Sequence, residues 1–377
     1  MTKRRLGDIC NVVSGSTPKT NVEEFWDGDI KWITPAELTE DSYVLEDSAR
    51  KITELAVEKT GLNSFPKGTV ILSSRAPIGK VAIAGCEMYC NQGFKNLICT
   101  EEIYNEYLYW FLKSKKDYLN SLGRGATFKE ISKSIVENIE VEVPKVEVQK
   151  EIAYQLQKCR EILALRRKEL FELDQLIKSR FVELFGDPST NSKGYPEKLL
   201  PEIAEYWNGL TYKPEDVSDE GTIVLRSSNI QNAALDFADI VRVNCKIGEK
   251  KYVQDNDILM CSRNGSARLV GKVALIKGIK EPMSFGAFMM IIRSTYYPYL
   301  VTYFQLPAFR AQITTGATTT INQITGRMLD VVKLPVPDLD TINEFTSFVH
   351  QVDKLKFLLI ISQRIYKEGG NRFGNKF

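Results

Sequence analysis

The chain has 377 residues, 43% hydrophobic and 26% charged, which is the composition of an ordinary globular protein long enough for two or three domains. Its formal net charge is only +2, so any binding to nucleic acid must come from local basic patches. A single histidine, His350, argues against Ser-His-Asp and Cys-His catalysis and against histidine-rich zinc sites.

The ends of the chain and its cysteines predict a cytoplasmic protein. Residues 1–12 lack the apolar stretch of a signal peptide, and no run approaches the roughly 18 apolar residues that span a membrane. Seven cysteines form no CxxC pair, which favours reduced thiols over disulfides or a metal site. We therefore expect no contact with a membrane and no metal site.

Five blocks of sequence occur twice, in the same order. Each block alone could be chance, but the preserved order predicts two similar repeats of about 140 residues. The matching blocks are 6–10 with 200–204, 29–38 with 222–231, 71–85 with 258–278, 88–100 with 283–295, and 124–144 with 315–335.

Each repeat mixes short strands with a few helices. Residues 68–74 and 79–85 have the β-branched content and the Gly and Pro boundaries of strands. Residues 105–122 have apolar side chains at helical spacing, and the corresponding segment, 298–314, is interrupted by Pro307. This irregular alternation predicts an α+β fold rather than a doubly wound sheet.

A long helix is expected after the first repeat, because residues 147–185 contain neither Gly nor Pro. Apolar side chains recur at steps of four and three, the pattern of a coiled-coil seam. At about 1.5 Å per residue this helix would be nearly 60 Å long. The seam residues are Ile152, Leu156, Leu163, Leu170, Leu173 and Ile177.

The apolar stripe of such a helix needs a partner helix to cover it, and residues 340–368 provide one after the second repeat. Phe345, Val352 and Leu359 are seven residues apart there, and a polar Gly/Asn tail follows. Residues 186–198 read as a linker. We predict repeats at 1–146 and 187–337, a central helix at 147–186 and a C-terminal helix with its tail at 338–377. The two helices would pack together and hold the repeats apart.

Basic residues recur in the loops of both repeats, which favours DNA binding. Arg and Lys suit phosphate contacts, and Arg can grip guanine with two hydrogen bonds. No phosphate-binding loop motif appears, and no carboxylate pair is singled out. The candidate DNA contacts are Lys19, Lys31, Thr34, Arg75, Lys80, Arg124 and Thr127 in the first repeat, and Lys213, Arg226, Ser228, Asn229, Arg263, Arg268, Lys272, Thr318 and Arg327 in the second.

The duplication, the strand-loop-strand FPKGTVILSSRAPIGKVAI (65–83), the block GATFKEISKSIVENIEVEVPKVEVQKEIA (125–153) and the helix ending KSRFVELFGDP (178–188) carry a family resemblance. With these features the chain resembles the specificity subunit of type I restriction–modification enzymes. The resemblance implies two target recognition domains, each reading half of a split, asymmetric sequence in double-stranded DNA. It also implies that the long helices form an antiparallel coiled coil that spaces the half-sites and docks two methyltransferase subunits.

The same resemblance implies a non-catalytic chain without cofactors of its own. S-adenosylmethionine, ATP and magnesium would then belong to partner subunits, including the restriction subunits that join the complex. The second repeat departs from the pattern: residues 332–345 lack the PxxEVQKEI-like motif, and the last helix lacks the FVELFGDP ending. Three alternatives stay open: a coiled-coil scaffold that does not bind DNA, an enzyme with an unrecognised carboxylate site, and a silent or truncated recognition cassette.

Overall fold

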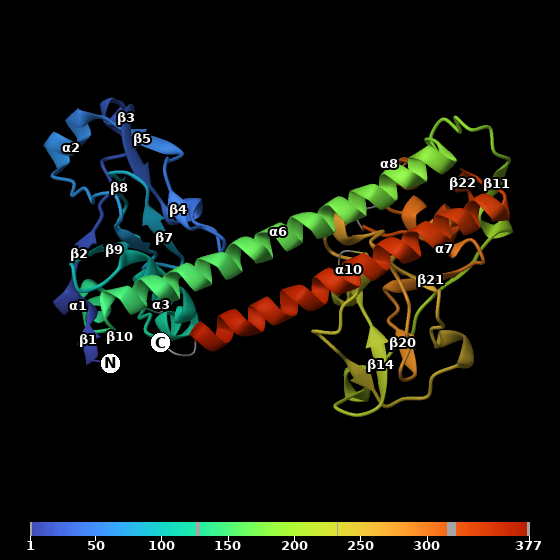
Figure 1. Cartoon of the computed structure of the whole chain (residues 1–377). Helices are drawn as coiled ribbons and strands as arrows, with labels where there is room; N and C mark the ends of the chain where they lie inside the picture. Colours follow the sequence, from blue (N-terminus) through green and yellow to red (C-terminus); the bar gives the residue numbers. More distant parts are fainter. Residues whose placement is uncertain (1, 126–128, 232, 315–321, 375–377) are drawn as a thin grey trace. The chain divides into compact units, whose positions relative to one another are not determined.

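A computed structural model describes residues 2–125, 129–231, 233–314 and 322–374, with side-chain environments up to Tyr366 (Figure 1). The chain divides into two compact units, each built around one repeat. The first unit is Met1–Lys168 with Leu359–Phe377, and the second is Glu169–Leu358. The two long helices, α6 (Val146–Phe185) and α10 (Leu339–Gly374), contribute to both units.

The first repeat is organised around a five-stranded sheet with one face covered by helix α3. Strands β6 and β7 are buried runs of Val, Ile, Leu and Ala, which is typical of strands covered on both faces. The sheet order is β2 (Cys10–Ser14), β9 (Lys95–Cys99), β6 (Val70–Leu72), β7 (Val81–Ala84) and β4 (Val44–Leu45). Its other elements are β5 (Arg50–Ile52), β3 (Trp26–Ile33) and β8 (Tyr89–Cys90) in a three-stranded sheet, and helices α1 (Leu6–Ile9), α2 (Glu54–Thr60), α3 (Asn105–Ser114), α4 (Lys116–Ser121) and α5 (Lys133–Glu137).

The second repeat has the same strand order. Its main sheet runs β12 (Glu205–Asn208), β21 (Met289–Arg293), β18 (Ile258–Cys261) and β19 (Val273–Leu275), matching β2, β9, β6 and β7. A second sheet contains β13 (Val217–Ser218), β17 (Arg242–Val243), β14 (Thr222–Leu225) and β20 (Met283–Phe285); β15 (Ile230–Gln231) pairs with β16 (Ala234–Leu235), and the helices are α7 (Tyr297–Tyr303), α8 (Pro307–Thr314) and α9 (Gly326–Asp330). The parallel pair β14–β20 corresponds to β3–β8. The predicted duplication and the mixed α and β fold are therefore confirmed.

Each repeat closes on itself through a pair of terminal strands. In the first, β1 (Thr2–Arg5) pairs with β10 (Glu140–Val143) in antiparallel register. In the second, β11 (Glu197–Leu199) pairs in the same way with β22 (Lys333–Pro335). The chain therefore leaves each repeat beside the point where it enters, and a long helix begins within a few residues of β10 and of β22.

Two details of the helices differ from the sequence-based expectation. The segment 105–122 is not one helix, because Lys115 leaves the helical region (φ −97°, ψ 18°) between α3 and α4. Helix α10 does not end before the Gly/Asn tail but continues through Gly369 and Gly370 to Gly374. A glycine costs a helix only about 1 kcal/mol relative to alanine, so the two glycines weaken it without ending it.

An aromatic cluster joins α6, α10 and α7 in the second unit. The rings of Phe181 and Phe185 lie 5.7 Å and 5.2 Å from Phe345 of α10, and 5.1 Å and 5.0 Å from Tyr299 of α7. Edge-to-face and stacked pairs at such distances add to the free energy of burying the rings. All four side chains are almost completely buried.

Ion pairs give the direction in which the helices pass each other in this unit. Asp174 of α6 accepts from Lys356 of α10 at 2.6 Å, and Arg180 of α6 pairs with Glu344 of α10. A later residue of α6 thus meets an earlier residue of α10. The two helices are therefore antiparallel over this stretch.

Replacing Phe181 by alanine should lower the free energy of unfolding of the second unit by about 3–5 kcal/mol, because the ring is fully buried in the aromatic cluster. Phe171→Ala is the matched control on the same helix. Its ring is 62% exposed, so its loss should cost no more than about 0.5 kcal/mol. Urea unfolding followed by circular dichroism measures both, and equal losses would contradict the assigned core.

Candidate nucleic-acid interface

The basic hairpins predicted from the sequence occupy the same place in both repeats. In the first, the Ser73 N–H donates to the Lys80 carbonyl across the β6–β7 loop at 2.9 Å. In the second, the Cys261 N–H donates to the Lys272 carbonyl across the β18–β19 loop, also at 2.9 Å. Lys80 and Lys272 are therefore equivalent positions.

A glycine ends each of these loops. Gly79 and Gly271 have φ of 88° and 78°, in the left-handed region that favours glycine. A Cβ on Gly271 would lie 2.8 Å from the guanidinium of Arg310, and one on Gly79 would lie 3.3 Å from Lys116. The Gly-Lys pair in the sequence thus marks the return of the chain into the second strand of each hairpin.

The arginines of the two loops are also equivalent. Arg75 forms an antiparallel bridge with Glu130, and Arg263 forms one with Gln323. Nine positions separate Arg263 from Lys272, whereas five separate Arg75 from Lys80. The two loops therefore start and finish at the same points of the fold but differ in length between them.

In the first repeat this arginine belongs to an ion-pair network. The Arg75 Nε lies 2.8 Å from Glu130 Oε2, and the buried Lys95 Nζ lies 3.4 Å from Glu130 Oε1. Burial raises the pKa of Glu130, but the hydrogen bond from Arg75 and the charge of Lys95 outweigh it, so its pKa lies below the usual value. The carboxylate therefore stays ionised and offsets the charge of Arg75.

In the second repeat three predicted contacts line one hollow. Arg226, Ser228 and Arg263 surround a space of about 520 Å³, together with Phe288 and Asp239. The Arg226 guanidinium pairs with Asp239 at 2.7 Å, and the Ser228 Oγ is buried with no hydrogen-bond partner among the described residues. Phe288 was not among the residues predicted from the sequence, although its aromatic side chain in the short turn between two strands was an available signal.

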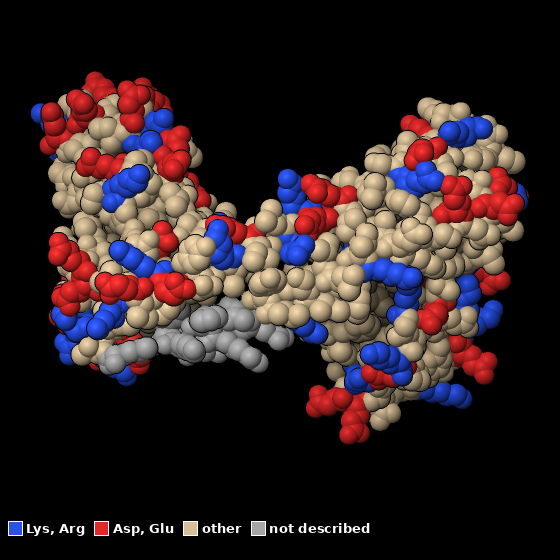
Figure 2. Space-filling view, viewed as in Figure 1, with Lys and Arg blue, Asp and Glu red and all other residues tan. Residues whose placement is uncertain are grey.

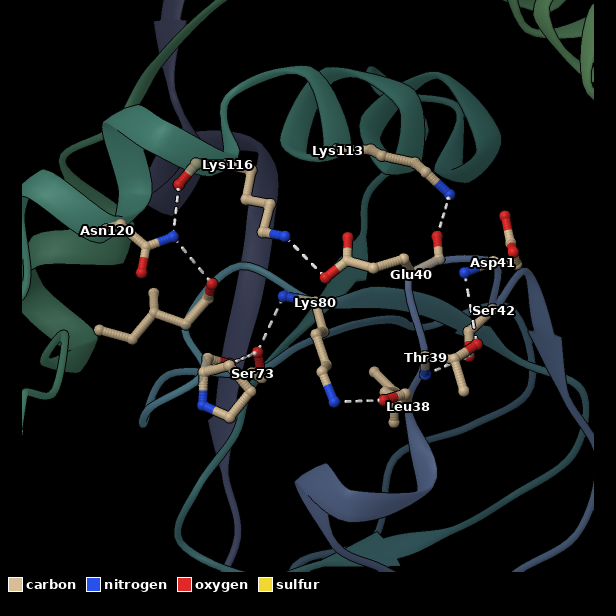
Figure 3. Close-up of polar contacts among 12 residues, drawn as sticks. Leu38, Thr39, Glu40, Asp41, Ser42, Ser73, Lys80, Lys113, Lys116 and Asn120 are labelled. Atoms are coloured by element: carbon tan, nitrogen blue, oxygen red, sulfur yellow. Dashed lines mark hydrogen bonds and ion pairs between the residues drawn. The ribbon is translucent and has the colours of Figure 1, made fainter. Parts of the chain in front are cut away.

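Several predicted contacts are engaged within the first repeat. Figure 3 shows Lys80 directed at the Leu38 carbonyl, and Lys116 beside it paired with Glu40 at 2.6 Å. The Lys31 Nζ donates to the Glu46 carbonyl at 2.6 Å. Lys80 and Lys116 hold the loop between β3 and β4, and Lys31 holds the residue that follows β4.

Thr34 and Asn229 lie at matching turns after β3 and β14. The Thr34 N–H donates to the Glu37 side chain at 2.8 Å, and the Arg226 N–H donates to Asn229 Oδ1 at 2.8 Å. Asn229 is buried and also donates to two backbone carbonyls of its loop. The strand and polar turn thus correspond between repeats, with Thr34 equivalent to Arg226.

The other predicted contacts are scattered over loops and, for Arg327, helix α9. Lys213 pairs with its neighbour Glu215. Figure 2 shows acidic and basic side chains interspersed over the visible faces of both units, as the small net charge implies. Lys19, Arg124, Arg268 and Arg327 are exposed, Lys272 is half-buried, and Thr127 and Thr318 lie outside the described residues.

The predicted seam positions of the long helices are mostly buried or half-buried. Ile152 packs against the core of the first repeat. Leu156, Phe345 and Val352 are buried, whereas Leu163, Leu170, Leu173, Ile177 and Leu359 are half-buried. The same helices also carry exposed apolar side chains that the seam pattern did not single out: Phe171, Leu176, Phe357 and Leu358.

Of the helices in the described part of the chain, none is long and apolar enough to cross a membrane. Within the same residues no three His, Cys, Asp or Glu side chains gather as a metal site would require.

Glu130→Gln should destabilise the first unit by about 1–3 kcal/mol at neutral pH, because the buried Lys95 ammonium loses its carboxylate. The pKa of Glu130 is lowered by folding, so its contribution is present above the unfolded pKa, about 4.3, and is lost as the pH falls through the folded pKa. Melting temperatures of wild type and variant should therefore converge in acid.

Glu102→Gln is the control for this experiment. Glu102 pairs with Arg4 at 2.6 Å, but both side chains are well exposed, so the loss should stay below about 1 kcal/mol. An effect of Glu130→Gln no larger than that of Glu102→Gln at pH 7 would contradict the network.

The chain is similar to known proteins in sequence over part of its length and in fold over the whole of it. Residues 1–175 match the family model described as the type I restriction modification DNA specificity domain. The type I restriction enzyme MjaIX specificity subunit of Methanocaldococcus jannaschii is 38% identical over 210 residues, 54% of this chain and 49% of that protein. The EcoKI specificity subunit of Escherichia coli is 25% identical over 308 residues, 75% of this chain and 65% of that protein.

The aligned region therefore spans about half the length of the first of these relatives. Two solved structures share the fold at 16% identity over the whole chain. One is the S subunit of a type I restriction–modification system from M. genitalium, with a TM-score of 0.58 and 95% of that chain covered. The other comes from a structural study of complex assembly and conformational transition in the type I R-M system, with a TM-score of 0.60 and 96% covered. Residues 1–175 therefore resemble the type I restriction modification DNA specificity domain, and the whole chain shares the fold of these two solved structures.

Proposed function

We propose that the chain recognises a bipartite, asymmetric sequence in double-stranded DNA, one half with each repeat. The observation that carries the proposal is the pair of equivalent hairpin arginines, Arg75 and Arg263, set in different surroundings on the same scaffold. Two copies of one scaffold with different loop chemistry suit the reading of two different half-sites.

The recognition units are residues 1–146 and 187–337, with the helices in 147–186 and 338–377 as spacers between half-sites. This division is supported by the terminal strand pairs, which close each repeat just before a long helix begins. A spacer of fixed length suits DNA, where half-sites on one face lie about 34 Å apart per helical turn.

The chain acts without catalysis of its own, in the cytoplasm, as part of a complex. Two methyltransferase subunits dock on the long helices, and restriction subunits join through the complex. S-adenosylmethionine, ATP and magnesium are used by those partners. Support for docking comes from apolar side chains left in solvent on the helices: Phe357 and Leu358 of α10 are each 62% exposed and line a hollow of about 550 Å³.

Methylome sequencing of cells that carry the chain and its methyltransferase should reveal one split sequence motif, which disappears when the chain is removed. In vitro, binding of the purified complex to that motif should weaken steeply with salt, because phosphate contacts release counterions. Recovery of no motif, together with partner binding that ignores salt, would favour the scaffold alternative.

Phe357→Glu should weaken co-purification of the methyltransferase, because a carboxylate would be buried in an apolar contact. Phe237→Glu is the matched control, since Phe237 is 45% exposed in a loop of the second repeat and is not part of either long helix. Equal amounts of bound methyltransferase with both variants would place the docking surface elsewhere.

A further inference from the structure

The hollow of the second repeat is formed by loops at one end of its sheets. The turn after β14 supplies Arg226, the loop after β18 supplies Arg263, and the turn between β20 and β21 supplies Phe288. All three segments project from strands with buried side chains, so the rim of the hollow stands on a rigid base. The three residues therefore lie within two positions of the end of a buried strand.

Arg263 and Phe288 form a cation–π pair at this hollow. The guanidinium carbon lies 5.2 Å from the centre of the Phe288 ring, a cation–π distance. The Phe288 carbonyl accepts from the N–H groups of both Ser262 and Arg263, at 2.9 Å and 3.1 Å. Ring and guanidinium are thus anchored to the same piece of backbone, although the ring is 58% exposed.

The first repeat has no counterpart of this ring. There the Ser74 N–H donates to the Gly93 carbonyl at 2.7 Å, which makes Gly93 equivalent to Phe288. A Cβ on Gly93 would lie 2.9 Å from both Asn91 Oδ1 and Pro35 Cγ. The first repeat therefore has little room for a side chain at the position where the second repeat exposes an aromatic ring.

The repeats also differ in whether a carboxylate compensates the charge of the hairpin arginine. Glu130 pairs with Arg75, whereas the equivalent residue in the second repeat is the neutral Gln323. Arg226, which also lines the hollow, is already paired with Asp239. Among the described side chains no carboxylate pairs with Arg263, so its guanidinium is uncompensated where it lies beside the Phe288 ring.

Resting on the proposed DNA recognition, we propose that Arg263 reads a guanine in the half-site of the second repeat and that Phe288 is the positioning residue that sets its plane. Guanidinium can donate two hydrogen bonds to the N7 and O6 atoms of guanine in the major groove. A planar group held on a ring loses little freedom on binding. Arg75, held by Glu130, is not a base-reading residue, and the first repeat reads its half-site with other side chains.

The experiment uses the full chain in complex with its methyltransferase and duplexes that carry the selected motif. In a second set of duplexes, each guanine of the second half-site is replaced in turn. Arg263→Ala and Arg263→Lys should each lower the preference for one guanine over its replacement by about 5- to 150-fold, the range of one good bidentate contact. Phe288→Leu should lower the same preference, at the same position, with an unchanged melting temperature.

Lys280→Ala is the matched control: this exposed cation of the second repeat is not among the predicted contacts, so its loss should leave the preferences in both half-sites unchanged. Arg263→Lys separates base from phosphate contacts, because lysine keeps the charge but lacks the planar fork. Wild-type preference in Arg263→Lys at every guanine of the second half-site, or a half-site without guanine, overturns the inference and leaves the proposed function standing. A wild-type complex that selects no split motif overturns the proposed function itself.

Discussion

Backbone hydrogen bonds, rather than side chains, fix the place of the arginine in each hairpin. The Ile131 N–H donates to the Ser74 carbonyl at 2.9 Å, and the Ile324 N–H donates to the Ser262 carbonyl at 2.7 Å. These groups lie beside buried side chains, where an unpaired amide would be costly. Because such bonds do not depend on the identity of the side chains, the surroundings of the arginine can change while its position stays.

The surroundings of the arginine cannot change arbitrarily, because a buried charge nearby needs a partner. In the first, the buried Lys95 requires the carboxylate of Glu130, which also holds Arg75. In the second, Met290 stands at the position of Lys95 and Gln323 at that of Glu130. If Glu130 alone were replaced, the buried ammonium of Lys95 would have no carboxylate partner. An arginine without a carboxylate at this position therefore requires that the buried lysine be replaced too.

Much of the fold follows from the sequence because its signals are local or repeated. Composition and spacing predict buried strands such as Val81–Ala84 and the uninterrupted helix Val146–Phe185. The break at Lys115 and the continuation of α10 past Gly370 do not, since each depends on small differences in free energy. For the site, the recurring arginines were found by repetition, whereas the roles of Glu130 and Phe288 depend on contacts between distant segments.

Loop length and loop chemistry therefore have different consequences in this fold. Lengthening a surface loop by four residues costs little entropy, so the second hairpin can carry Arg268 on an extended tip without strain on its strands. Arg263 sits at the base of the same loop, where the strand ladder holds it whatever the length of the tip. A contact made from the base keeps its register as the tip varies, whereas a contact from the tip moves with every insertion. The tip can therefore diverge in length and sequence while the arginine at the base keeps its place in the fold.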